Sequence, residues 1–215
     1  MDAAVKAYSG EPDRRASRRL ETERRIVEAA TGLFLRDGYA ATSLAAVADA
    51  ADVGERTLYL RFGTKAGLLK RAIDVATVGD TEPVDLAHRE LSIRAMDAPT
   101  LDERLRTFAQ IARRTLARSA GLIEVAQQAV GEAPIAESVQ AGREATQDFV
   151  RRFWRQLRTD GLIGDDIDLD WVIATTGLLA HAETYILMTR TQQWSPDAYQ
   201  QWLYRTWRHF ATTPS

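Results

Sequence analysis

The sequence predicts an all-α protein with a small N-terminal unit of three helices followed by a larger helical region. Three observations support this fold class. Apolar residues recur at helical spacing through most of the 215 residues. Alternating runs of β-branched residues with Asn-Gly or Asp-Gly turns, which are typical of hairpins, are missing from the sequence. Helix-capping residues and helix-ending glycines divide the chain at short intervals.

The first helix is expected over residues 17–36, after a flexible basic arm at residues 1–16. Its apolar residues Ile26, Ala30, Leu33 and Phe34 follow i, i+4, i+7, i+8 spacing and therefore line one face. Gly38 is expected to end this helix, because glycine readily adopts the left-handed conformation found after helix C-termini.

Two short helices and a longer one are expected next. The second helix begins at Thr42 and Ser43, whose hydroxyls can cap its first turn. Asp52, Val53 and Gly54 interrupt the helical pattern, and the third helix is expected over 55–62. Thr64 can cap a fourth helix over 65–78.

The remainder is expected to be less regular over 79–99 and then helical. Five helices are predicted, at 101–119, 121–132, 134–159, 169–190 and 196–210. Prolines at 134 and 196 suit the first turn of a helix, where an absent N–H group costs nothing.

The distribution of charge separates the two regions. The net charge of the whole chain is -2, but residues 14–71 carry twelve Lys and Arg against seven Asp and Glu. The remainder of the chain is acidic. A basic N-terminal region beside an acidic remainder is the asymmetry expected when one part of a protein meets phosphate groups.

Two short helices joined by a tight turn in a basic region are the pattern of a helix-turn-helix. In that motif the second helix enters the major groove of DNA, so its outer face must be polar. Here the outer face carries Glu55, Arg56, Thr57, Tyr59 and Arg61. The inner face carries Val53, Leu58 and Phe62.

The stretch ATSLAAVADAADVGERTLYLRFGTKAGLL, residues 41–69, resembles the helix-turn-helix of the TetR family of transcriptional regulators. The resemblance extends over about residues 26–69, and the rest of the chain matches only in length and helical pattern. The shared features are Phe34, Asp37-Gly38-Tyr39, Thr42, Val47-Ala48, Val53, Thr57-Leu58-Tyr59, Phe62, Lys65 and Leu68-Leu69.

The resemblance implies roles for individual residues in binding double-stranded operator DNA. Thr42 and Ser43 at the start of the second helix, together with Tyr59 and Lys65, would contact phosphates. Glu55, Arg56 and Thr57 would face the bases, and Arg61 would reach a base or a phosphate. The sequence departs from the family's usual choices at Gly54, Arg56, Leu60 and Arg61, and an arginine at 56 can pair with guanine.

Residues 17–78 are therefore expected to form the DNA-binding domain, and residues 79–215 an effector-binding and dimerisation domain. The last two predicted helices are apolar on most sides, which indicates burial of more than one face. In the family this corresponds to a homodimer interface formed by these two helices.

The family also implies a cavity for an apolar or aromatic small-molecule effector among the C-terminal helices. Candidate lining residues are Phe108, Ile111, Phe149, Phe153, Trp154, Thr175, Leu178, His181 and Tyr185, with Glu183 as a polar anchor. The alternative is that these side chains form an ordinary core. The resulting hypothesis is a ligand-released repressor that binds a pseudo-palindromic operator as a homodimer.

Other functional classes find little support in the sequence. Cysteine is absent, the three histidines form no metal-ligand pair, and no nucleophile or phosphate-loop motif is present. We therefore expect no enzyme activity, cofactor or metal. The polar first twenty residues and the lack of a long apolar run predict a cytoplasmic protein without a membrane association. The main alternative function is a helical ligand-binding protein that has lost DNA binding.

Overall fold

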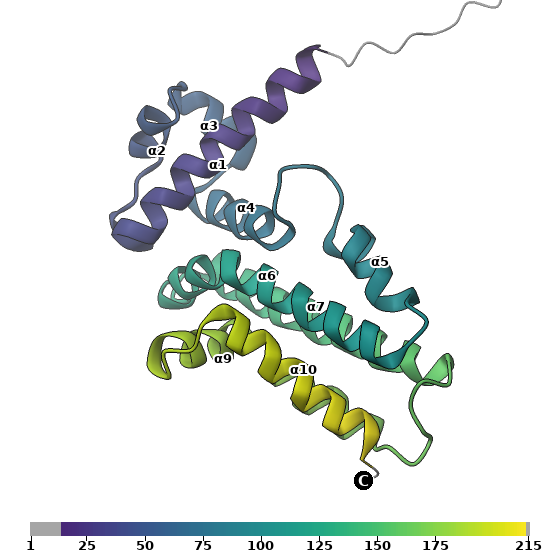
Figure 1. Ribbon diagram of the computed structural model, residues 1–215. Coiled ribbons are helices and arrows are strands. Elements are labelled where there is room, and N and C mark those ends of the chain that lie inside the picture. The colour runs from purple at the N-terminus through teal and green to yellow at the C-terminus, as the bar shows by residue number, and fades with distance from the viewer. Residues whose placement is uncertain (1–13, 214–215) are drawn as a thin grey trace, which may run out of the picture.

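The computed structural model describes residues 14–213, and within this range the chain forms ten α-helices and no strand. Figure 1 shows α1, α2 and α3 grouped at one end and the longer helices α6, α7 and α10 layered at the other, with α4 between them. The prediction of an all-α fold with an N-terminal helix-turn-helix and a larger helical domain is confirmed.

The N-terminal helices are α1 (Arg14–Ala41), α2 (Leu44–Ala50) and α3 (Glu55–Phe62), followed by α4 (Lys65–Val78). Gly38 breaks the helical conformation inside α1 with φ 77°, as expected from the sequence. Ser43 caps α2 by accepting a hydrogen bond from the Ala46 N–H, and Thr64 caps α4 in the same way. The predicted bounds of the third and fourth helices agree with α3 and α4.

The first helix begins earlier than the sequence suggested. The flexible arm was expected at residues 1–16, but α1 begins at Arg14, so residues 14–16 are helical. Residues 1–13 of the predicted arm lie outside the described residues.

The second region contains α5 (Glu90–Asp97), α6 (Leu101–Gln128), α7 (Ala133–Thr159), α8 (Leu169–Leu179), α9 (Ala182–Ile186) and α10 (Pro196–Thr212). A 3₁₀ turn, η1 (Leu86–His88), precedes α5, and a π-helical turn, η2 (Leu187–Thr191), follows α9. Residues 79–99, expected to be irregular, therefore hold a turn and a helix.

Three of the predicted helices were wrong in extent. The helices expected at 101–119 and 121–132 are one continuous helix, α6, because Gly121 remains helical where the Leu35 side chain lies against it. The helix expected at 169–190 is divided at Ala180 and His181 into α8 and α9. The exposed backbone at this break finds partners, since the Leu178 carbonyl accepts a hydrogen bond from the Thr184 hydroxyl.

Two hydrophobic clusters hold the fold together. The N-terminal cluster includes Ile26 and Phe34 of α1 and Leu58 of α3, all fully buried, and it extends to Leu122 of α6 and Ile135 of α7. The second cluster fills the space between α5, α6, α7, α8 and α10. Because α6 contributes to both clusters, the small unit is packed against the larger one and its orientation is fixed by apolar contacts.

Candidate nucleic-acid interface and internal cavity

Helix α3 presents a polar surface on one side and is anchored on the other. Leu58 is fully buried and Phe62 is half-buried, whereas Glu55, Arg56 and Tyr59 are exposed. The turn before α3 is fixed by a hydrogen bond from the Val53 N–H to the Ala48 carbonyl at 3.0 Å. This arrangement agrees with the expected division between an inner and an outer face.

Other predicted DNA-binding residues differ in how accessible they are. Ser43 is exposed and Thr57 is half-buried. Thr42 is buried, and its hydroxyl donates to the Gly38 carbonyl at 2.8 Å. The Thr42 side chain therefore stabilises the break after α1, and its hydroxyl is not free to donate to a phosphate.

Lys65 joins the start of α4 to the segment after the break in α1. Its ammonium group donates to the Tyr39 carbonyl at 2.9 Å and lies 4.1 Å from the centre of the Tyr39 ring. It also donates to the Ala40 carbonyl at 3.5 Å. A lysine ammonium has three N–H donors, so one remains for an external anion.

Arg61 is directed away from the outer face of α3. Its guanidinium donates to Glu23 of α1 at 3.2 Å, and the other carboxylate oxygen of Glu23 accepts a hydrogen bond from Arg71 of α4 at 2.7 Å. All three side chains are largely shielded from solvent. The expectation that Arg61 reaches a base or a phosphate is therefore not matched by its position in this structure.

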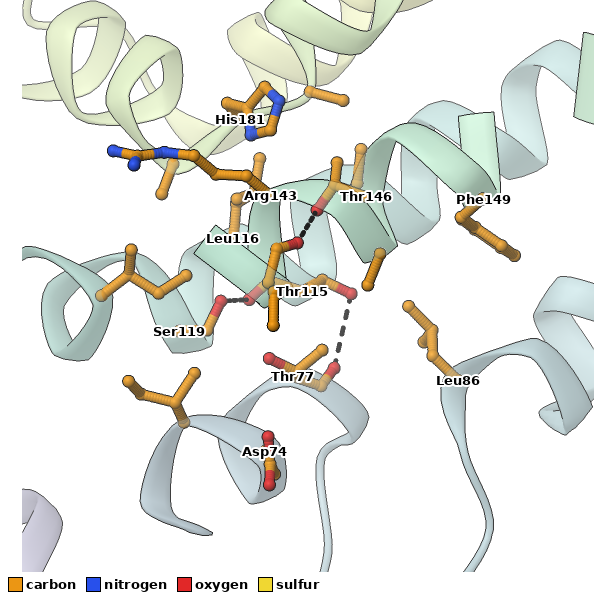
Figure 2. Close-up of a pocket in the computed structure, with 18 of the residues that line it drawn as sticks. Asp74, Thr77, Leu86, Thr115, Leu116, Ser119, Arg143, Thr146, Phe149 and His181 are labelled. Carbon is orange, nitrogen blue, oxygen red and sulfur yellow. Dashed lines mark hydrogen bonds between the residues drawn. The ribbon is translucent and has the colours of Figure 1, made fainter. Parts of the chain in front are cut away.

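An internal cavity of about 530 Å³ lies between α4, α6 and α7 and reaches α9 and the loop before α5. Its volume falls within the range of small-molecule sites. Figure 2 shows Leu86 and Phe149 on one side and His181 and Arg143 on another, and the Thr115 hydroxyl of α6 donates a hydrogen bond to the Thr77 carbonyl of α4 at 3.4 Å.

The cavity contains some of the predicted effector-binding residues but not all of them. Phe108, Ile111, Phe149, His181 and Glu183 line it. The other predicted residues do not. Phe153 and Trp154 are fully buried core residues, Tyr185 packs edge-to-face against Tyr199, Thr175 is half-buried on α8, and Leu178 is 63% exposed.

Sequence reasoning missed the part of the lining that comes from α4 and from the middle of α6. Ile73 and Thr77 of α4 contribute, as do Ala112, Thr115, Leu116, Ser119 and Ile123 of α6. The spacing of the α6 residues, together with Phe108 and Ile111, is that of a single helical face. That spacing was a usable signal, because all of these residues except Ile123 lie within the helix predicted at 101–119.

Several polar groups that line the cavity already have partners within the protein. Ser119 donates to the Thr115 carbonyl at 2.9 Å and Thr146 to the Gly142 carbonyl at 3.0 Å. Lys70 pairs with Asp74 at 2.7 Å, and Arg143 pairs with Glu183 at 2.7 Å. A ligand in this space therefore meets mainly apolar surface and hydroxyl oxygens that can still accept hydrogen bonds.

His181 lies at the break between α8 and α9, directly before α9, and borders the cavity. Burial lowers the pKa of its imidazole below the ordinary value; the charge of Glu183 opposes this effect and that of Arg143 adds to it. The imidazole is therefore held in its neutral form more strongly than a histidine in water.

The described residues contain no group of three or more His, Asp or Glu side chains placed to bind a metal ion. Asp168 caps α8 by accepting a hydrogen bond from the Trp171 N–H. Within residues 14–213, none of the helices combines the length and apolar character needed to cross a membrane.

Residues 26–72 match the sequence model of the family described as bacterial regulatory proteins, tetR family. No curated protein sequence matches the chain significantly. The sequence resemblance to the TetR family is thus confirmed for the N-terminal domain.

Solved structures show the same fold across most of the chain. A protein described as a TetR-family transcriptional regulator from Syntrophomonas wolfei has a TM-score of 0.72 at 16% identity, covering 90% of this chain and 96% of that one. A similar regulator from a Rhodococcus species has a TM-score of 0.69 at 16% identity, covering 89% and 99%. The regulator FadR from Bacillus subtilis, in complex with stearoyl-CoA, has a TM-score of 0.66 at 15% identity, covering 87% and 97%.

Proposed function

We propose that this protein, which has the fold of TetR-family transcriptional regulators, is a repressor that binds a pseudo-palindromic operator as a homodimer and is released by an apolar ligand. The observation that carries the proposal is the outer face of α3, where Arg56 and Tyr59 are exposed beside the exposed cap residue Ser43. Arg56 makes no ion pair with any described residue. Its guanidinium is therefore available for the bidentate pairing with guanine that arginine makes in the major groove.

Homodimer formation is supported by an apolar surface on α8 and α10. Trp171 is 52% exposed and Leu178 is 63% exposed, and both lie on the largely apolar helix α8. Trp171 packs edge-on against Phe210 of α10, with 5.0 Å between the ring centres, so the surface extends across both helices. Exposed apolar surface of this kind is typical of protein interfaces, and a two-fold dimer would present two α3 helices to two half-sites.

Release by a ligand is supported by the position of α4. This helix follows α3 after only Gly63 and Thr64, and its residues Ile73 and Thr77 line the cavity. Arg118 of α6 donates to the Ala76 and Thr77 carbonyls at 2.9 and 3.0 Å, which ties the end of α4 to the cavity wall. A ligand that displaces α4 would shift α3 and so weaken DNA binding. Because coupling between two sites is reciprocal, bound DNA would weaken ligand binding to the same extent.

An apolar ligand is favoured because most of the charged groups that line the cavity are paired within the protein, Lys70 with Asp74 and Arg143 with Glu183 among them. Arg152 also lines the cavity, where it lies over the Phe149 ring, and a ligand charge buried away from it would require breaking one of these pairs. The structural similarity to FadR, which was solved with stearoyl-CoA, supports a ligand with a long apolar part.

The test is selection from randomised duplex DNA by the purified full chain, with the double variant Arg56→Ala, Tyr59→Ala in parallel. We expect the wild type to enrich an inverted repeat and the variant to enrich none. Arg205→Ala, which removes an exposed arginine from α10, is the matched control and should select the same repeat as the wild type. Failure of the wild type to enrich any sequence would favour a ligand-binding protein without DNA-binding function.

A further inference from the structure

We infer that Leu60 is a specificity-determining residue that contacts the 5-methyl group of a thymine beside the base read by Arg56. The inference rests on the proposed DNA-binding function and goes beyond it, because it assigns a base identity to one side chain. Its basis is the position of a large apolar side chain on the outward face of α3.

Leu60 is 76% exposed, more than any other large apolar side chain among the described residues. An exposed leucine has no significance by itself, since much of every protein surface is apolar. Here, however, it lies in a helix of eight residues whose inner side is already filled by Leu58 and Phe62. Leu60 therefore does not belong to the core, and its apolar surface is available for contact with an external partner.

Helical geometry places Leu60 one turn after Arg56 on the same side of α3. Residues separated by four positions are neighbours along a helix face, and one turn rises about 5.4 Å. That rise corresponds to about one or two base-pair steps, at about 3.4 Å per step. Two side chains so placed reach neighbouring bases when the helix lies in a major groove.

The other side chains of α3 leave this position to Leu60. Arg61 is held by Glu23 of α1 at 3.2 Å, and Thr57 is half-buried. Tyr59 is 52% exposed, and its hydroxyl suits a phosphate. Glu55 is exposed too, but it precedes Arg56, so Leu60 is the exposed apolar residue one turn after Arg56.

The chemistry of the two side chains differs and defines what each can recognise. Arg56 can donate two hydrogen bonds to O6 and N7 of guanine. Leu60 has neither a donor nor an acceptor, and the distinctive apolar group in the major groove is the thymine 5-methyl. Burial of Leu60 against that methyl group favours thymine over cytosine and over uracil.

The experiment uses the operator obtained by selection with the full chain and replaces its thymines one at a time, in both half-sites, with deoxyuridine. This exchange removes the methyl group and retains base pairing. Burial of one methyl group favours binding by about fourfold per half-site. We expect the affinity of the wild type to fall by about that factor for each half-site in which one particular thymine is replaced. Replacement of any other thymine should leave the affinity unchanged.

Variants identify the side chain responsible. Leu60→Ala should bind the thymine and deoxyuridine operators equally, whereas Leu60→Met should retain the preference. Val130→Ala, which shortens another exposed apolar side chain outside α3, should behave as the wild type. Thermal melting of each variant should stay close to the wild type, because Leu60 is exposed and its truncation leaves the core intact.

The outcomes separate this inference from the function on which it rests. If a selected operator is bound equally well with every thymine replaced, or if Leu60→Ala keeps the wild-type preference, the assignment of Leu60 is wrong and DNA binding stands. A selected half-site without any thymine would also overturn the assignment. If no operator is selected at all, the proposed function is wrong and the assignment falls with it.

Discussion

The carboxylate of Glu23 in α1 lies 3.2 Å from the guanidinium of Arg61 in α3, and its second oxygen accepts a hydrogen bond from Arg71 in α4. One acidic side chain of α1 therefore connects α1 to both α3 and α4. The three side chains are between 20% and 30% exposed, so their interaction is only partly screened by solvent. Glu23 restrains α3, and in the proposed complex with DNA it would withhold one positive charge from the phosphates.

Replacing Glu23 with glutamine should weaken this restraint with little change in side-chain size. We expect the free energy of unfolding to fall by about 1 kcal/mol, between the values of exposed and buried ion pairs. Release of Arg61 should raise affinity for non-operator DNA and steepen the log–log dependence on salt by about one unit. Urea denaturation and fluorescence anisotropy on a non-operator duplex at several salt concentrations measure the two effects.

The matched control is Glu28→Gln, since Glu28 also lies on α1 but forms an exposed pair with Arg24 at 3.1 Å. This variant should leave the salt dependence and the stability near the wild-type values. An unchanged salt dependence in the Glu23 variant would show that Arg61 does not reach phosphate even when it is released.

Leu178→Asp should dissociate the proposed dimer. The side chain is exposed on the apolar surface of α8, so aspartate is tolerated by the monomer but would be buried and unpaired in a two-fold interface. Sedimentation velocity should show a shift from dimer to monomer, and affinity for a two-half-site operator should fall more than tenfold. Val130→Asp, at another exposed position, should remain dimeric, and a dimeric Leu178 variant would place the interface elsewhere.

The sequence predicted the N-terminal helices well because local signals determine them. Gly38, Ser43 and Thr64 act at the ends of their own helices, and each does in the structure what its residue type favours. Gly121 misled the prediction because its effect depends on a distant residue. The Leu35 side chain lies where a Cβ at 121 would point, so glycine serves helix packing there and α6 continues.

The division between α8 and α9 was not predictable from periodicity for a related reason. The carbonyls released at the break are satisfied from outside the helix, and the Leu179 carbonyl accepts a hydrogen bond from the Tyr199 hydroxyl of α10 at 2.5 Å. The apolar spacing of the sequence continues through the break, so it does not reveal that Tyr199 supplies a hydrogen bond there. Without this division, Leu178 and Tyr185 were placed beside the cavity, where the structure does not put them.

Filling the cavity should prevent ligand binding without unfolding the protein. Ala112 lies on the cavity wall in α6, and Ala112→Phe would occupy much of the space that an apolar ligand needs. We expect binding of the neutral fluorescent probe N-phenyl-1-naphthylamine to weaken at least tenfold, with a melting temperature equal to or above that of the wild type. Ala198→Phe, an exposed position on α10, is the control. Equal probe binding by all three proteins would mean that the probe occupies another site.

The break at His181 should make stability depend on pH. Burial lowers the pKa of the folded-state imidazole below that of the unfolded chain, with Glu183 opposing and Arg143 reinforcing the shift. The unfolded state therefore binds more protons as the pH falls below about 6.5, and stability decreases toward the folded-state pKa. His181→Gln should lose less stability than the wild type between pH 7.5 and 5.5 in urea denaturation, whereas His209→Gln, at an exposed position, should follow the wild type. Identical pH dependence in all three proteins would show that protonation of His181 does not oppose folding.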